Sequence, residues 1–130
     1  GEYTFAKVDT TFGGERNFSG YYLQASYLLT GETQPYKNAN GVFDRVRPKK
    51  NSGFKPGDGW GAWEVGARYS AVDLTDGPVR GGKQSGYTFG VNWYINPFVG
   101  ASLNYSHDKV ENDLFEGDLN ELQARVRFEF

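Results

Sequence analysis

The chain has 130 residues, of which 17% are aromatic and 18 are glycine, and it contains neither cysteine nor methionine. Its formal net charge of -2 gives no overall attraction to nucleic acid. It contains no run of about 18 apolar residues, which a membrane-spanning helix would need. A mean hydropathy of -0.65 resembles that of a soluble protein. It does not exclude a membrane β-barrel, because strands that alternate lipid-facing and lumen-facing residues average to such values.

Apolar and polar residues alternate with period two in six segments, and each segment is predicted to be a β-strand. In chain order the six segments span residues 2–8, 18–30, 60–72, 84–95, 98–110 and 123–130. Near the last segment a helix competes, because Leu119, Leu122 and Val126 are spaced as on one helix face. Phe128 and Phe130 continue only the strand pattern, which favours the strand.

The two faces of these strands differ in composition. The polar face carries mainly Gly, Ser, Asn and Gln with few charges, which suits a water-filled lumen, and its Glu64 and Arg68 are interpreted as lumen wall and not as a catalytic pair. Turning this face to lipid would cost about 2–4 kcal/mol for an arginine at mid-membrane. The apolar face carries aromatic residues that suit the girdles of a membrane barrel. These are Tyr21, Tyr27, Trp63, Tyr69, Tyr87, Trp93 and Tyr105.

The predicted fold is therefore an all-β, antiparallel transmembrane β-barrel in a single domain, residues 1–130. Six strands cannot close alone, since single-chain barrels have at least about 8, and an open edge in lipid leaves backbone groups unpaired. We expect part of a larger barrel, with strands pooled from several chains as the alternative. A soluble antiparallel sheet that binds a partner through an aromatic face, and a fragment that matters mainly as a substrate of the barrel assembly machinery, are further alternatives.

The closing segment is similar to the recognition signal of bacterial outer-membrane barrels, in which a polar residue is followed by glycine and then by aromatics ending in phenylalanine. Gln123, Phe128 and Phe130 fit this signal, whereas Arg125 stands where glycine is usual. The similarity implies location in the outer membrane of a Gram-negative cell, with its lipid and the assembly machinery as partners.

Known barrels of this kind have a periplasmic C-terminus, which fixes the expected side of each connection. Asn96-Pro97 then forms a periplasmic turn, and the connections 9–17, 73–83 and 111–117 are extracellular. Segment 32–59 falls on the periplasmic side, where loops are short. Either a strand near 42–46 has been missed, or this long loop folds into the lumen.

Segment 32–59 concentrates six of the fourteen basic residues of the chain against three acidic ones. Fixed positive charge in a lumen with low-dielectric walls attracts anions, and rings of Arg and Lys select them. The candidate anion-binding residues are those of this segment together with three on the strands. They are Lys37, Arg45, Arg47, Lys49, Lys50, Lys55, Arg68, Arg125 and Arg127. The alternative is a solvated basic loop that touches anionic lipid.

Three motifs occur in order: GETQPYKNANGVFDRVRPKK, GWGAWEVGARYSAVDL and GGKQSGYTFGVNWYINP. Together they resemble the C-terminal part of the phosphate-selective porins O and P. The resemblance implies a sixteen-stranded, homotrimeric outer-membrane barrel that passes phosphate, pyrophosphate or polyphosphate along a ladder of Arg and Lys, with these strands as the last six. The main ladder of that family lies upstream, so no single binding residue is transferred from it.

Two further features of the sequence do not indicate a nucleotide-binding, metal-binding or catalytic site. GPVRGGKQ resembles a phosphate-binding P-loop, but Gln84 replaces Ser or Thr and a strand pattern follows where a helix must begin. Lys83 is interpreted as a charge at the barrel mouth. His107 is the only histidine and cysteine is absent, so a His/Cys metal site or a histidine triad lacks its parts. We expect no enzyme activity, metal or cofactor, and interpret His107 as a rim residue.

Overall fold

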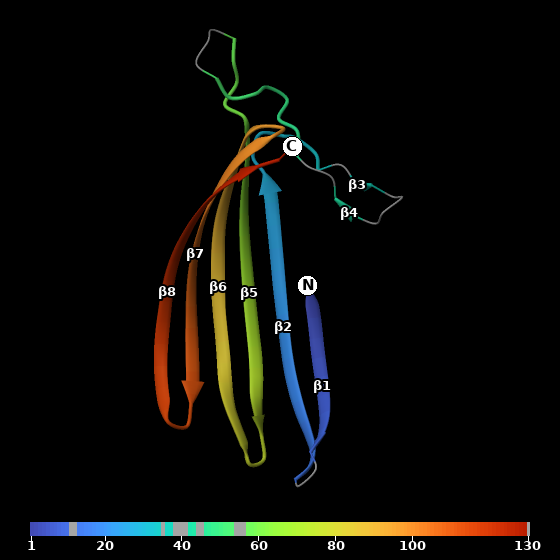
Figure 1. Cartoon of the computed structure of the whole chain (residues 1–130), viewed down its shortest axis with the longest axis vertical. Coiled ribbons are helices and arrows are strands. Elements are labelled where there is room, and N and C mark those ends of the chain that lie inside the picture. Colours follow the sequence, from blue (N-terminus) through green and yellow to red (C-terminus); the bar gives the residue numbers. More distant parts are fainter. Residues whose placement is uncertain (11–12, 35, 38–41, 44–45, 54–56, 130) are drawn as a thin grey trace. The chain divides into compact units, whose positions relative to one another are not determined.

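The computed structural model describes residues 1–10, 13–34, 36–37, 42–43, 46–53 and 57–129, and the regular structure in these residues is β-strand. The long strands are β1 (Glu2–Thr10), β2 (Gly14–Leu28), β5 (Ala62–Asp76), β6 (Val79–Asn96), β7 (Val99–Asn112) and β8 (Phe115–Phe128). They form one antiparallel sheet in the order β1-β2-β5-β6-β7-β8 (Figure 1). The β1–β2 register pairs Glu2 with Tyr22 and Thr10 with Gly14.

No helix among the described residues has the length and apolar character needed to cross a membrane.

All six predicted strands are confirmed, but they are longer than expected. The expected connection 73–83 shrinks to a turn at Gly77, because β5 ends at Asp76 and β6 begins at Val79. The last strand begins at Phe115, and the helical alternative for this region is therefore wrong. The added residues are mostly polar or charged, so they carry no hydrophobic alternation; their backbone pairing alone extends the strands.

The strand suspected near 42–46 exists in part, as β4 (Val42–Phe43). It pairs with β3 (Tyr36–Lys37) in a separate two-stranded sheet. β4 therefore adds no strand to the six-stranded sheet, and the connection between β2 and β5 remains long.

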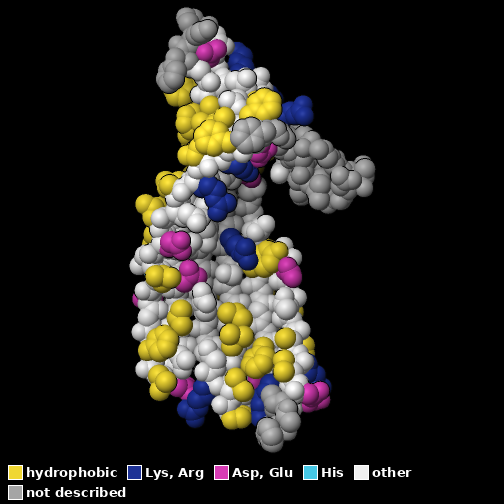
Figure 2. Space-filling model, viewed as in Figure 1, with side chains coloured by type: hydrophobic (Ala, Val, Ile, Leu, Met, Phe, Trp, Pro, Cys, Tyr) yellow, Lys and Arg dark blue, Asp and Glu magenta, His cyan; other side chains and the backbone are white. Residues whose placement is uncertain are grey.

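The apolar face of the sheet is exposed, and the polar face is the more covered one. Along β6, the apolar residues Tyr87, Phe89 and Val91 are exposed, with Phe89 at 54%. On the opposite face of the same strand, Gly86 is buried and Thr88 is half-buried. Figure 2 shows hydrophobic side chains spread over the surface of the strands. Among the described residues only Val46 and Ala62 are buried hydrophobics. Within the described residues, the aromatic side chains of the strands therefore lie on an exposed face and do not form a core.

Contacts between Cα atoms divide the chain into two units, each with part of every long strand except β1. The first unit comprises Gly1–Ala25, Ala67–Phe89 and Tyr105–Leu122, and the second Ser26–Gly66, Gly90–Asn104 and Gln123–Phe130. In the first unit, oppositely charged side chains lie together near the turns (Figure 2). These ion pairs are Lys7–Glu15, Arg80–Asp113, Lys83–Asp73 and Lys109–Glu116.

The second unit contains a tryptophan cluster on its apolar face. The rings of Trp63 and Trp93 stack at 5.3 Å. Both indole Nε1 atoms donate hydrogen bonds to the Trp60 carbonyl, at 3.1 and 2.8 Å. Gly61 has a φ of 71°, and a Cβ at this position would lie 2.3 Å from the Tyr94 carbonyl oxygen. Only glycine fits where β5 is about to begin.

Candidate functional site

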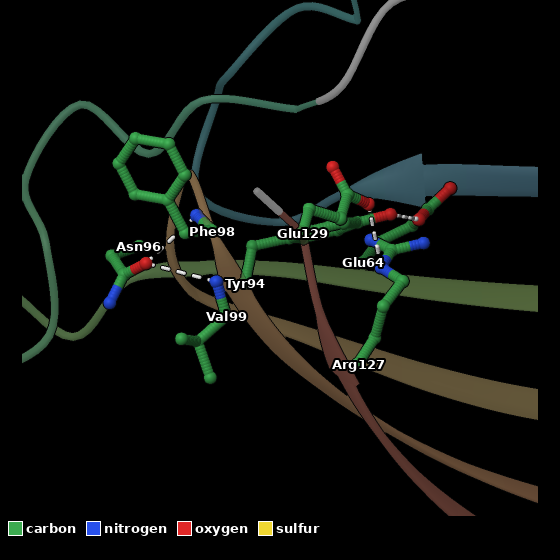
Figure 3. A network of polar contacts seen from close by, with 7 residues as sticks. All are labelled: Glu64, Tyr94, Asn96, Phe98, Val99, Arg127 and Glu129. Carbon is green, nitrogen blue, oxygen red and sulfur yellow. Dashed lines mark hydrogen bonds and ion pairs between the residues drawn. The ribbon is translucent and has the colours of Figure 1, made fainter.

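The polar face of the second unit carries a hydrogen-bonded carboxylate, Glu64, on β5. Its Oε2 accepts a hydrogen bond from Asn92 Nδ2 at 3.0 Å. It accepts another from the Tyr94 hydroxyl at 2.7 Å (Figure 3). Ser26 on β2 also hydrogen-bonds to this carboxylate. These residues meet because every second side chain of a strand points to the same face. The half-buried negative charge is thereby satisfied by neutral donors from two neighbouring strands.

Arg127 on β8 contacts the same tyrosine. Its guanidinium carbon lies 5.8 Å from the centre of the Tyr94 ring, within the range of a cation–π contact. The Arg127 Nε also forms an ion pair with Glu129 at 3.0 Å (Figure 3). The positive charge of Arg127 is therefore offset by a residue just beyond the end of β8.

The β7–β8 register explains how Arg127 reaches this ring. Glu129 N donates to Phe98 O at 2.8 Å, and counting along the antiparallel pair places Arg127 opposite Gly100 and Arg125 opposite Ser102. A Cβ on Gly100 would lie 3.8 Å from Arg127 Nη2. Because glycine has no side chain, the guanidinium can lie across it towards β6.

A shallow pocket of about 200 Å³ lies on this part of the sheet. Its lining residues are Asn92, Trp93, Tyr94, Gly100, Ala101, Ser102, Asn104, Arg125 and Arg127. Within the described part of the chain, the exposed guanidinium of Arg125 has no ion pair or hydrogen bond. A pocket with a free guanidinium and nearby neutral polar groups can bind an anion.

The hairpin beside this pocket is closed by Asn96. Its Oδ1 accepts hydrogen bonds from the backbone N–H groups of Phe98, at 2.8 Å, and Val99, at 2.9 Å (Figure 3). Asparagine forms such side-chain turns readily. The turn predicted at Asn96-Pro97 is confirmed, and it fixes the start of β7 and hence the position of Gly100.

Within the second unit, a clamp ties the long connection between β2 and β5 to the start of β5. Its residues are Thr30, Gly31, Glu32, Lys49 and Trp63. Lys49 Nζ donates to Gly31 O at 2.6 Å, and Lys49 N donates to a Glu32 carboxylate oxygen at 3.2 Å. The Thr30 hydroxyl donates to Glu32 and accepts from Trp63 N at 3.1 Å. Lys49, predicted as an anion ligand, has its ammonium directed to this backbone carbonyl.

The clamp also changes the acidity of Glu32. Partial burial acts to raise the pKa of this carboxyl, but the hydrogen bonds from Thr30 and Lys49, together with the Lys49 charge, outweigh it and lower the pKa below the usual value. The ionised form of Glu32 therefore stabilises the clamp.

After the clamp, the connection packs against the end of the β6–β7 hairpin. Val46 is only 4% exposed, and it lines a small cavity together with Tyr94, Asn96 and Arg127. Ser52 N donates to Ile95 O at 2.8 Å. The described part of this connection thus contacts residues of the polar face.

The remaining predicted anion-binding residues either do not line the pocket or lie outside the described residues. Arg68 belongs to the first unit, where its guanidinium carbon lies 4.2 Å from the centre of the Tyr22 ring. Arg47 and Lys50 are exposed, Lys37 lies in β3, and Arg45 and Lys55 lie outside the described residues. The structure therefore brings together Arg125 and Arg127 among the predicted set.

Glu64 and Arg68 both contact residues of neighbouring strands, and the sequence did not predict which residues these are. Asn92 and Tyr94 share the polar face of β6, and that alternation was the available signal. Of the predicted assembly residues, Gln123 and Phe128 lie on β8 and Phe130 lies outside the described part.

The P-loop-like motif and His107 both belong to the first unit. β6 begins at Val79, inside GPVRGGKQ, so no helix follows this motif, and Lys83 pairs with Asp73 at 3.0 Å. His107 lies on β7, 2.8 Å from Asn120 Oδ1. The described residues contain no cluster of three or more metal-binding side chains.

Comparison of the sequence with known proteins finds a family and two relatives. The sequence model of the family "Phosphate-selective porin O and P" matches residues 1–130. Porin O of Pseudomonas aeruginosa is 32% identical over 136 residues, which cover 95% of this chain and 30% of that protein. A Caulobacter vibrioides protein described as uncharacterized is 37% identical over 98 residues, which cover 75% of this chain and 19% of that protein. The chain thus spans less than a third of these relatives, and it belongs to the phosphate-selective porin O and P family.

Proposed function

We propose that the complete protein is an outer-membrane porin that passes anions by passive diffusion, with phosphate, pyrophosphate or polyphosphate as the preferred ions. The observation that carries this proposal is the polar face of the second unit, where Arg125 and Arg127 line a pocket whose other polar groups are neutral. Family membership supports the ion class. The exposed apolar face, with tyrosine and tryptophan among its side chains, supports contact with membrane lipid.

In this proposal the polar face of the sheet lines a wet lumen. A guanidinium can offer two parallel N–H groups to phosphate oxygens, which a single ammonium cannot. The lumen is aqueous, so each contact is screened and moderate in strength. Moderate sites suit a channel, because an ion that binds must also leave.

We further infer that the long connection 32–59 folds into the lumen. Support comes from Val46, which is nearly fully buried against a cavity that Tyr94 and Arg127 also line. Arg47 and Lys50 would then add positive charge near the pocket. Association into a homotrimer, and recognition of Gln123, Phe128 and Phe130 by the barrel assembly machinery, stay predictions.

The test is the reversal potential of the complete protein in a planar lipid bilayer under a potassium chloride gradient. We expect anion selectivity, and a chloride current that falls when inorganic phosphate is added, because phosphate occupies the same cationic sites. Cation selectivity that does not change when Arg125, Arg127, Arg47 and Lys50 are neutralised together would contradict the proposal.

A further inference from the structure

The two arginines of the pocket differ in how much of their charge is available to an ion. Arg127 forms an ion pair with Glu129 at 3.0 Å and also contacts the Tyr94 ring. Within the described part of the chain, Arg125 has no such partner, although it lines the same pocket. The two arginines lie two residues apart on the same face of β8, and their surroundings thus differ.

We propose that Arg125 is the residue that contacts the permeating anion in this pocket, and that Arg127 is a positioning residue that shapes the pocket. This inference rests on the proposed anion channel and goes beyond it by dividing the work between two arginines.

Neutral groups next to Arg125 favour its role as the anion contact. The β7–β8 register places Arg125 opposite Ser102. On the other side of β7, a Cβ on Gly90 would lie 2.6 Å from Asn104 Oδ1, so counting two residues along the antiparallel pair places Asn92 opposite Ser102. Asn92, Ser102 and Arg125 therefore form a row across three strands.

The chemistry of this row suits an oxyanion. Neighbouring strands lie about 4.8 Å apart, so a tetrahedral anion near Ser102 can reach both the hydroxyl and the guanidinium. The Asn92 amide donates to Glu64 at 3.0 Å through one of its two N–H groups, so Ser102 and Arg125 are the donors with no such carboxylate partner in this row. Arg125 supplies the charge and the two parallel N–H groups.

The next row explains the role of Arg127. In this row the hydroxyl of Tyr94 donates a hydrogen bond to Glu64 at 2.7 Å. Gly100 has no side chain, so Arg127 can lie across it towards the Tyr94 ring. Its Nε is occupied by Glu129. Because its charge is offset by Glu129 and its guanidinium contacts an aromatic ring, Arg127 forms one wall of the pocket and attracts an anion less than Arg125 does.

The experiment measures how inorganic phosphate inhibits chloride conductance of the complete protein in planar bilayers. For Arg125→Gln we expect the half-inhibiting phosphate concentration to rise about two- to fivefold, the effect of one screened charge contact. Arg125→Lys should give an intermediate rise, because it keeps the charge and loses the fork. Arg127→Gln should give a smaller rise than Arg125→Gln, and Glu129→Gln, which frees the Arg127 charge, should lower the concentration.

Arg80→Gln is the matched control, since it removes one positive charge from an exposed ion pair in the first unit. It should leave the half-inhibiting concentration unchanged. Folding of every variant is checked by the shift in electrophoretic mobility between heated and unheated samples in detergent, so that loss of the barrel is not read as loss of binding. An equal or larger effect of Arg127→Gln, or no effect of Arg125→Gln in a folded channel, overturns the inference. A wild-type channel that selects cations would instead overturn the proposed function itself.

Discussion

The two units of the chain differ in charge and in how that charge is compensated. The sequence ranges of the first unit carry 6 basic and 11 acidic residues, whereas those of the second carry 8 basic and 5 acidic residues. Cations of the first unit are paired near the strand ends, as in Lys83–Asp73 and Lys109–Glu116. The formal charge of -2 for the whole chain therefore hides a basic region whose field can act on anions.

The units also differ in the surroundings of their acidic groups. Glu116 of the first unit is exposed and pairs with Lys109 at 2.6 Å. Glu64 of the second unit is half-buried and accepts hydrogen bonds from neutral donors. Exposed ion pairs contribute little to stability, whereas a covered carboxylate with several donors contributes more. The contrast teaches that the covered carboxylate of the second unit is held by neutral donors and does not take a cation as its partner.

The largest expected effect tests the premise that the first unit turns its apolar face to lipid. Phe89 is exposed and lies near the middle of β6, so Phe89→Arg should destabilise the folded membrane protein by about 2–4 kcal/mol. The measurement is the fraction folded in lipid vesicles across a urea titration. Thr88→Arg, one residue away on the polar face, is the matched control and should cost far less. Equal losses for the two variants would contradict the assignment of the faces.

The next effect concerns the hydrogen-bonded carboxylate of the second unit. Glu64→Ala leaves Asn92 and Tyr94 without their acceptor, and we expect a loss of about 1 kcal/mol in the free energy of unfolding. Glu64→Gln keeps one acceptor oxygen and should lose less. Urea unfolding of both variants in vesicles measures the difference. A Glu64→Ala protein as stable as wild type would show that water replaces this network without cost.

A smaller effect is expected for the clamp on the connection 32–59. Because the pKa of Glu32 is lowered in the folded protein, its contribution to stability is complete above the ordinary pKa of 4.5 and is lost as the pH falls through the lower folded value. The unfolding temperature in detergent, measured below pH 4.5, should therefore fall less with pH in Glu32→Gln than in wild type. Identical pH profiles would show that Glu32 is not held by Lys49 and Thr30.

The smallest effect is expected in the first unit. Glu116→Gln removes an exposed ion pair with Lys109, and we expect no measurable change in the urea midpoint. Set beside Glu64→Ala, this variant measures the contrast between the units directly. A loss as large as that of Glu64→Ala would remove the distinction drawn between them.

The sequence predicted the strands wherever apolar residues mark alternate positions, as in β5 and β6. It did not predict the first half of β8, because the stretch FEGDLNEL places polar residues on both faces. Nor did it predict the length of the β5–β6 hairpin, where charged residues continue the backbone pairing without hydrophobic alternation. In these regions hydrogen bonding between strands decides the structure, and single-strand patterns do not report it.

Within the candidate site, strand alternation was enough to place Arg125 and Arg127 on the polar face. The pairing of Arg127 with Glu129 was also accessible, since the two residues are two apart on one face of the predicted segment 123–130. The lining of the pocket was not accessible, because Tyr94, Gly100 and Arg127 meet only through the registers of three strands. The use of Lys49 in a clamp depends on loop geometry, which charge counting cannot supply.

The tryptophan cluster gives this protein a built-in spectroscopic reporter. The chain has three tryptophans, and Trp60, Trp63 and Trp93 all lie in the second unit. The stacked indoles share a single carbonyl acceptor, so their emission will respond to any opening of that unit. The first unit contains tyrosines but no tryptophan. Tryptophan fluorescence during refolding will therefore time the second unit alone, and comparison with backbone circular dichroism will reveal whether the two units form together.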